Sequence, residues 1–295
     1  MKSPLVVSCV IGIASGVLAA LCGVGGGIIM VPAFVAFLGL SQKSATATSM
    51  AVIVPTAIAA TIRHIHNRYV DWNVVVMTAL SATLVSFFVA DYVKKLGNET
   101  LTRIFAILIL IVGTKMLLYP EQRAAPKPSV ESVVAVNDSE SAVKDGAVEA
   151  SDRQAWQQYA FPLLIGVVSG VLAALCGVGG GIIMVPAFVL LLSFDQKLAT
   201  GTSMAVIIPT AIAATSRHVM NKLVDWRVFV PTAVSATLVS FFVADYVRTL
   251  EHHVLTRIFA IVVVLVGVKM LMTPGTKPAA PPPSPASGTQ RIGTK

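Results

Sequence analysis

Charged residues are scarce in this sequence, and long stretches contain none. Lys, Arg, Asp and Glu make up 12% of the 295 residues, 55% are hydrophobic, and the mean hydropathy is +0.80. Soluble domains carry about 25% charged residues, so the composition excludes an ordinary soluble domain and predicts a polytopic membrane protein. The net charge of +8 does not indicate nucleic-acid binding, because Lys and Arg occur singly at the ends of apolar runs.

Cysteine is rare and acidic residues avoid the apolar runs, which excludes several kinds of site. Cys9, Cys22 and Cys176 lie in apolar segments without C-x-x-C or Cys/His spacing, so we expect neither disulfides nor a metal site. No Asp or Glu falls in the middle of an expected span. Carriers of metal ions or protons usually have acidic ligands or relays inside the membrane, so this absence favours an anionic or neutral solute.

Motifs that would indicate an intramembrane enzyme are also missing. The sequence has no H-E-x-x-H, no G-x-S-x-G and no paired aspartates in the middle of a span, so we expect no catalytic residue and no cofactor. Two G-x-G-G-G runs are present, but they follow apolar segments and lack the strand–helix context of a nucleotide-binding fingerprint.

An internal duplication organises the chain. Ile11 to Pro120 align with Ile165 to Pro274 without a gap, and about seven in ten positions are identical. Carriers built from repeats bind their solute between the copies, so we expect the solute path to lie on a pseudo-two-fold axis. The predicted parts are a first transmembrane repeat, a polar acidic linker, a second repeat and a disordered Pro/Ser-rich tail, at residues 1–120, 121–160, 161–274 and 275–295.

Each copy contains three ordinary candidate spans, which approach the roughly 20 apolar residues that cross a bilayer. They are Ala45–Ile62, Val74–Val93 and Leu101–Tyr119 in the first copy, and Ala199–Ser216, Val228–Val247 and Leu255–Thr273 in the second.

The segment before these spans, Leu5 to Leu40, is abnormal. Its roughly 36 uncharged residues would form a helix of about 54 Å, which is too long for a bilayer, so the helix must bend or break. Glycine is a poor helix former, so the break is expected at Gly23 to Gly27, shortly before Pro32, and at the equivalent glycines of the second copy.

Two topologies follow from this break. A single broken crossing gives four spans per copy and parallel copies, whereas two full crossings give five spans and inverted copies. A re-entrant hairpin would also change whether the number of crossings per copy is even or odd, and with it the relation of the copies. Loop charges favour four, because the termini, the linker and the Lys/Arg-rich turns then share the cytoplasmic side. The expected fold is all-α: a polytopic membrane helical bundle of two four-span or five-span repeats with broken first helices.

The glycine runs are candidate solute sites. Unwound backbone in a membrane is costly unless it is buried in protein or lines a wet cavity, and breaks at corresponding positions of two repeats are typical of transporter binding sites. A half-helix that begins at Ile28 or Ile182 would direct its positive end and free amides toward an anion. The alternative is that the glycines only let helices pack tightly.

Hydroxyl residues follow each glycine segment, in ATATSMAV and ATGTSMAV. They either cap the next helix or donate to the oxygens of a solute. The candidate substrate-binding residues are therefore Gly23, Gly25, Gly26, Gly27, Thr48, Ser49, Gly177, Gly179, Gly180, Gly181, Thr202 and Ser203.

A polar cluster shared by the two copies is a candidate gate or solute mouth. Its positive charge would attract an anion, while the alternative is a solvated turn with a local Arg–Asp pair. Trp72 and Trp226 beside it are typical interfacial anchors. The cluster consists of Arg63, His64, Asn67, Asp71, Arg217, His218, Asn221 and Asp225.

With the glycine run, the proline and the T-S stretch in each half, the sequence resembles the sulfite exporter TauE/SafE family. The residues that carry the resemblance are Gly23 to Gly27, Pro32, Thr48 and Ser49, with Gly177 to Gly181, Pro186, Thr202 and Ser203. The resemblance covers both halves. It implies an inner-membrane carrier of small, often sulfur-containing anions such as sulfite or sulfonates, with the glycine segments near the solute.

The leading interpretation is a secondary transporter of a small anion that alternates access around two Gly-rich helix breaks in a bacterial inner membrane. Its partners would be the lipid bilayer and the solute, with a coupling proton or sodium ion and a homodimer left open, and no nucleic acid. A passive anion channel and an intramembrane enzyme are the alternatives. A membrane scaffold without transport would leave the paired breaks without a purpose.

Overall fold

The computed structural model describes residues 3–92 and 146–246, with side chains from Tyr159 onward in the second range. It also describes Gly97, Arg103, Ile107, Thr114, Val264 and Val268 as isolated positions. Apart from these isolated positions, the expected spans Leu101–Tyr119 and Leu255–Thr273, most of the linker and the tail lie outside the described residues.

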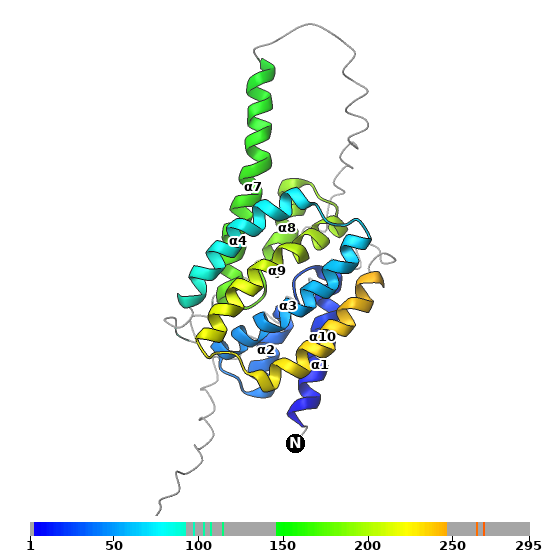
Figure 1. Cartoon of the computed structure of the whole chain (residues 1–295), viewed down its shortest axis with the longest axis vertical. Coiled ribbons are helices and arrows are strands. Elements are labelled where there is room, and N and C mark those ends of the chain that lie inside the picture. The colour runs from blue at the N-terminus through cyan, green and yellow to red at the C-terminus, as the bar shows by residue number, and fades with distance from the viewer. Residues whose placement is uncertain are drawn as a thin grey trace, which may run out of the picture.

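The described residues form helices and no strands, as expected for an all-α bundle (Figure 1). Six of these helices are long and apolar enough to cross a membrane, while α2 and α8 are short. The helices are α1 (Pro4–Cys22), α2 (Gly27–Leu38), α3 (Gln42–His66), α4 (Trp72–Tyr92), α7 (Gly146–Cys176), α8 (Gly181–Leu192), α9 (Gln196–Met220) and α10 (Trp226–Tyr246).

Helix α7 begins inside the segment that was expected to be a linker. It starts at Gly146, and the part that is apolar enough to cross a membrane starts at Tyr159. The boundary predicted at residue 160 therefore falls within a helix, because the composition changes there but the backbone continues.

The break predicted in each first helix is confirmed. Helix α1 ends where Gly23 takes a left-handed conformation (φ 68°) and donates its N–H to the carbonyl of Ala19. Gly26 (φ 76°) then precedes the first residue of α2. The second copy repeats this geometry between α7 and α8. With 12 residues, α2 is about 18 Å long and too short to cross a bilayer by itself.

Helices α3 and α10, from different copies, run in the same direction. At their starts, the N–H of Asp225 donates to Oγ1 of Thr48 at 2.9 Å. At their ends, Arg63 Nη1 lies 3.3 Å from Asp245 Oδ2. Helices α9 and α4 are related in the same way. Because a short turn makes α4 run opposite to α3, α3 and α9 are antiparallel, as Figure 1 shows.

Helix α1 runs in the same direction as α3. It packs on α10, where Thr232 donates to the carbonyl of Ser8 and Gly16 contacts the backbone of Ala236. The segment that contains α2 must therefore bring the chain back to the side where α1 began. Gly25 lies against Ile53 in the middle of α3, so the chain turns back near mid-depth. Helices α1 and α2 form a re-entrant hairpin.

The described helices do not fit a single broken crossing with parallel copies, which the loop charges favoured. Corresponding helices of the two copies point in opposite directions, so the copies are inverted within the described residues. The physical reason is that the glycine break reverses the chain instead of bending it. A pseudo-two-fold axis therefore lies across the helices, between α3 and α9.

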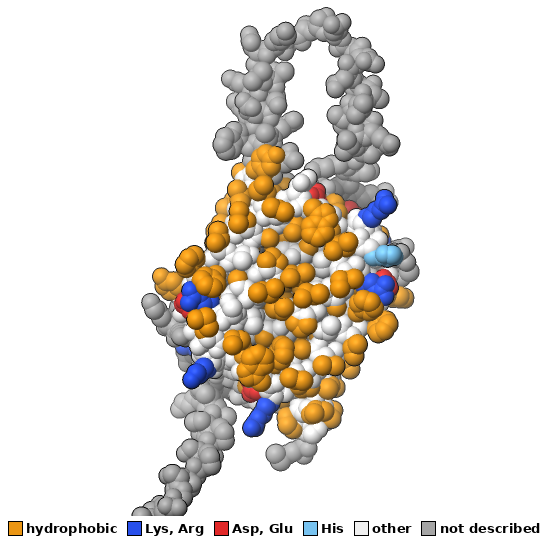
Figure 2. All heavy atoms as spheres, viewed as in Figure 1, with side chains coloured by type: hydrophobic (Ala, Val, Ile, Leu, Met, Phe, Trp, Pro, Cys, Tyr) orange, Lys and Arg blue, Asp and Glu red, His pale blue; other side chains and the backbone are white. Residues whose placement is uncertain are grey.

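Packing between the copies uses small residues, and the outside is apolar. Gly12 and Gly16 of α1 contact the backbone of α10, and Gly166 and Gly170 of α7 contact that of α4. A side chain at any of these positions would separate the helices. Figure 2 shows a face covered by apolar side chains, with Lys and Arg near its margins. Such a surface suits contact with lipid.

Candidate functional site

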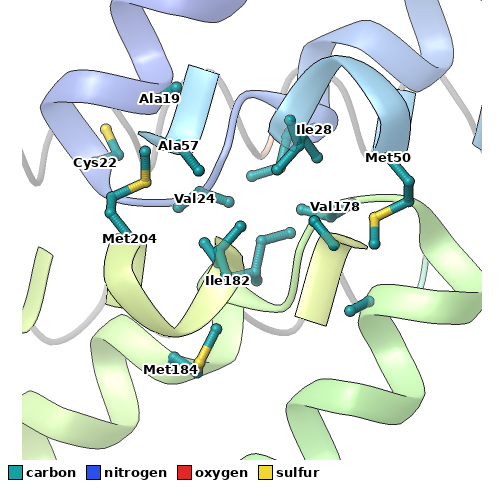
Figure 3. Packing of buried hydrophobic residues seen from close by; sticks show 14 of the residues in the cluster. Ala19, Cys22, Val24, Ile28, Met50, Ala57, Val178, Ile182, Met184 and Met204 are labelled. Carbon is teal, nitrogen blue, oxygen red and sulfur yellow. The ribbon is translucent and has the colours of Figure 1, made fainter. Parts of the chain in front are cut away.

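The two helix breaks contact each other at the centre of the bundle. A Cβ atom on Gly27 would overlap the carbonyl oxygen of Gly177, and one on Gly181 would overlap that of Gly23. All residues of both breaks are buried. Figure 3 shows the apolar side chains of Val24, Ile28, Val178 and Ile182 gathered around this crossing. The structure thus brings the predicted glycines of both copies together.

Two of the predicted hydroxyls donate hydrogen bonds to the helix breaks of the opposite copy. Ser49 donates to the carbonyl oxygen of Gly177 at 2.7 Å, and Ser203 donates to that of Gly23 at 2.9 Å. Both serines also lie near carbonyls of their own helices, at 2.9 Å for Ser49 and 2.8 Å for Ser203. A hydroxyl has one proton, so each serine divides it between its own helix and the break of the opposite copy.

The other two predicted hydroxyls hold turns. Thr48 accepts the N–H of Asp225 at 2.9 Å, and Thr202 accepts that of Asp71 at 3.0 Å. Neither caps its own helix, because Ser41 caps α3 through the N–H of Ser44. The capping alternative for these hydroxyls is therefore wrong.

The positive end of each half-helix faces a carbonyl of the opposite copy. Helix α2 begins at Gly27, one residue before the expected start, and its first N–H groups have no acceptor within the helix. Gly27 lies on the carbonyl of Gly177, where α7 ends. Opposite partial charges at helix ends attract, so the C-terminus of α7 and the N-terminus of α2 are electrostatically compatible neighbours.

The arginine of the polar cluster pairs across the copies and not locally. Arg63 makes its 3.3 Å ion pair with Asp245, and its guanidinium lies 4.0 Å from the ring centroid of Phe241. The matching pair joins Arg217 to Asp91 at 3.4 Å, with the guanidinium 3.9 Å from the ring of Phe87. The alternative of a local Arg–Asp pair is wrong.

The aspartates of the cluster have a different task. Asp71 Oδ1 accepts the N–H groups of Asn73 and Val74 and so starts α4, and Asp225 does the same for α10. Asn67 ends α3 by donating its backbone N–H to the carbonyl of Arg63. The side chain of Asn221 donates to Asp91 at 3.3 Å.

The histidines of the cluster are buried behind the arginines. His64 and His218 have no exposed surface, and their ring nitrogens have no hydrogen-bond partner among the described residues. His64 packs against Gly201 of α9. Because the copies are inverted, the eight residues of the cluster are not one site: four lie at one end of the bundle and four at the other.

The sequence reasoning missed the partners of the two arginines. Asp91, Phe87, Asp245 and Phe241 were not among the candidate residues, although they belong to SFFVADY, which is identical in the two copies. Over the ranges 3–92 and 146–246, no group of three or more His, Cys, Asp or Glu side chains is placed to hold a metal ion.

Comparison with known proteins gives consistent relatives. Residues 161–293 match the family described as Sulfite exporter TauE/SafE. A Bacillus subtilis (strain 168) protein named "Probable membrane transporter protein YunE" is 26% identical over 274 residues, which cover 90% of this chain and 97% of that protein. A Haemophilus influenzae "Probable membrane transporter protein" is 24% identical over 281 residues, which cover 89% and 96%. Both relatives are named as probable membrane transporter proteins.

Proposed function

We propose that this chain is a multi-pass membrane transporter of the TauE/SafE family and carries a small oxyanion by alternating access around the crossed helix breaks. Sulfite, a sulfonate or a related anion is the expected solute class. The observation that carries this proposal is that each half-helix N-terminus, at Gly27 and at Gly181, contacts the break of the opposite copy at the buried centre of the bundle.

The charges near the crossing support an anion over a cation. Among the described residues, the buried polar side chains are Ser, Thr, Gln and His, without a buried carboxylate or ammonium group. The positive electrostatic features at the crossing are therefore the amide ends of α2 and α8. Oxyanions bind such ends well, because several N–H groups donate to the same oxygen atoms.

Binding would replace contacts that the empty protein makes with itself. The carbonyl of Gly177 now faces the start of α2 and accepts from Ser49. When the end of α7 moves away, both the amides of α2 and the hydroxyl of Ser49 become available to an oxyanion. The pseudo-symmetric exchange at α8 uses Gly23 and Ser203. The hydroxyls of Ser49 and Ser203 thus have protein acceptors in the closed arrangement, which avoids unpaired polar groups in the membrane.

The test is uptake of labelled sulfite, sulfate and a small sulfonate into proteoliposomes. Leucine at Gly26 or Gly180 would be uninformative, since even a Cβ atom there overlaps the backbone of Ser15 or Ser169. We therefore choose Ser49→Ala and Ser203→Ala, with Thr56→Val as the matched control, because the Thr56 hydroxyl bonds to Val52 of its own helix. Losing one hydrogen bond to a charged solute should raise KM about tenfold.

The possible results distinguish a carrier from a channel and test whether the two serines bind the solute. Saturable uptake of one anion, with KM raised in both serine variants and unchanged in Thr56→Val, supports the carrier and its site. Uptake that never saturates and shows no counterflow indicates a channel instead. An unchanged KM in both serine variants would remove these serines from the solute site.

A further inference from the structure

The two ion pairs between the copies lie at opposite ends of the bundle. Arg63 is in the last turn of α3 and Arg217 in the last turn of α9. Helices α3 and α9 lie side by side and run in opposite directions (Figure 1). If the bundle spans the membrane, one ion pair therefore faces each side of it.

Helix α10 is attached to α3 differently at its two ends. At its start, Thr48 accepts the N–H of Asp225, and Ser44 donates to the carbonyl of Leu223 at 2.9 Å. Thr48 is completely buried. At its end, the attachment is the ion pair, with 28% of the Arg63 side chain and 39% of the Asp245 side chain exposed, together with the contact of the Arg63 guanidinium with the ring of Phe241. The start is suited to a pivot, because two hydrogen bonds fix the backbone of the turn there, whereas a partly exposed ion pair contributes little to stability.

Helix α1 is bound to move with α10. Gly12 and Gly16 bring the two backbones into contact, and Thr232 donates to the carbonyl of Ser8 at 3.3 Å. Since α1 and α10 point the same way, the end of α1 lies toward the side of the Arg63–Asp245 pair. That end is Gly23, whose carbonyl accepts from Ser203 of α9. Swinging the end of α10 outward therefore draws Gly23 away from Ser203.

The other ion pair has the same connections. Helix α7 packs on α4 through Gly166 and Gly170, and α7 ends at the break where Ser49 donates to the carbonyl of Gly177. Helix α4 is attached at its start by Thr202 and at its end by the Arg217–Asp91 pair, whose side chains are 26% and 45% exposed.

We infer that the Arg63–Asp245 and Arg217–Asp91 pairs are two gates on opposite faces of the membrane, which open in alternation. Opening the first swings α1 and α10 about Thr48 and uncovers the N-terminus of α8. Opening the second swings α7 and α4 about Thr202 and uncovers that of α2. This inference rests on the proposed carrier function. With both pairs formed and the breaks in contact, the structure is the occluded state between the two open ones.

The mutual contact of the breaks explains why one gate must stay closed. Gly181 lies on the carbonyl of Gly23, and Gly27 lies on that of Gly177. If α1 moves away, the end of α7 still seals the other half of the crossing. If both moved, the backbone contact between the two breaks would be lost and the crossing would be open to both faces. An open gate also frees its guanidinium from the aspartate, so that the arginine faces the incoming anion.

The experiment measures access to the crossing from each side. Reporter cysteines replace Val24 or Val178, both 2% exposed, in a chain whose native Cys9, Cys22 and Cys176 are changed to Ala. A membrane-impermeant methanethiosulfonate reagent is applied to right-side-out and to inside-out membrane vesicles. Asp245→Asn should speed labelling at least fivefold from one face only, and Asp91→Asn should do so from the opposite face only.

Two further variants keep the test decisive. The charge swap of Arg63→Asp with Asp245→Arg should restore the slow labelling, which separates gate opening from general loosening. A thiol-cleavable bifunctional cross-link between Arg63→Cys and Asp245→Cys, which spans the length of the lost Arg side chain, should abolish transport and block labelling from its own face until it is cleaved. The inference is overturned if both aspartate variants act from the same face, or if neither changes the labelling rate.

Labelling needs no transported solute, so the two proposals fail separately. Face-specific labelling without uptake of any tested anion would leave the gates standing and overturn the proposed solute class. Saturable anion uptake with labelling that is the same in all variants would leave the carrier standing and overturn the gates.

Discussion

The crossing of the breaks and the two ion pairs are both contacts between the copies, but they are built from different groups. At the crossing, main chain lies on main chain, as where Gly27 meets Gly177, and everything is buried. At the faces, long side chains bridge the helices in partly exposed pairs. Backbone atoms at the crossing are packed too closely to accept an added side chain at Gly27 or Gly181, whereas the ion pairs separate at little cost in free energy. The crossing therefore fixes the fold, and the helix ends at the two faces are free to move.

The largest effect on stability is expected from Gly27→Ala. The substitution normally favours a helix by about 1 kcal/mol, but here the new Cβ overlaps the carbonyl oxygen of Gly177 and the Cα of Val178, which are both backbone. We expect a loss of about 3 kcal/mol in the free energy of unfolding, measured as thermal unfolding in detergent.

Gly39→Ala is the matched control for this variant. Gly39 has a left-handed backbone (φ 67°), and nothing lies within 4 Å of the position of its Cβ. It should cost only about 1 kcal/mol, the strain of a side chain in that conformation. Equal losses in the two variants would show that the crossing is not tightly packed.

A smaller effect is expected from Ser49→Ala and Ser203→Ala. Each removes the hydroxyl that donates to a break carbonyl of the opposite copy. Leaving a buried carbonyl without this donor should cost about 1–2 kcal/mol, and the two variants should lose similar amounts because the sites are equivalent. Thermal unfolding of each single variant and of the double variant checks this prediction. An unchanged unfolding temperature in either single variant would contradict it.

The smallest effect is expected from Asp245→Asn and Asp91→Asn. Exposed ion pairs contribute about 0–1 kcal/mol, so the unfolding temperature should fall by no more than about 4 °C. A loss as large as that of Gly27→Ala would contradict the view of these pairs as weak gates. Little change in stability together with faster labelling would sharpen the contrast with the crossing.

Features that depend on local sequence could be predicted. Apolar runs identified the spans in α3, α4, α9 and α10, and the glycine run identified the break in each first helix. The spans and the breaks could be predicted because hydrophobic length and helix breaking are decided within about 20 residues. The solute-binding residues remain a prediction, although the structure brings their glycines together.

Features that depend on the packing of the copies could not be predicted. Each copy contains Arg, Asp and Ser at the same positions, so the sequence cannot say whether Arg63 pairs with Asp71, Asp91 or Asp245. The direction of the copies was equally open, because it depends on whether the glycine break bends or reverses the chain. The contacts between α3 and α10 and between α9 and α4 decide the direction of the copies, and the contact of Gly25 with Ile53 shows where the chain turns back.

The pairing of helices from opposite copies has a consequence for how the protein is made. Helix α1 has its most extensive contact with α10, and α4 has its own with α7, so neither helix of the first copy has its main partner when it leaves the ribosome. The carbonyl of Gly23 likewise lacks its donor until Ser203 is synthesised, 180 residues later. The helices of the first copy therefore cannot complete their packing in the membrane until translation of the second copy is nearly complete.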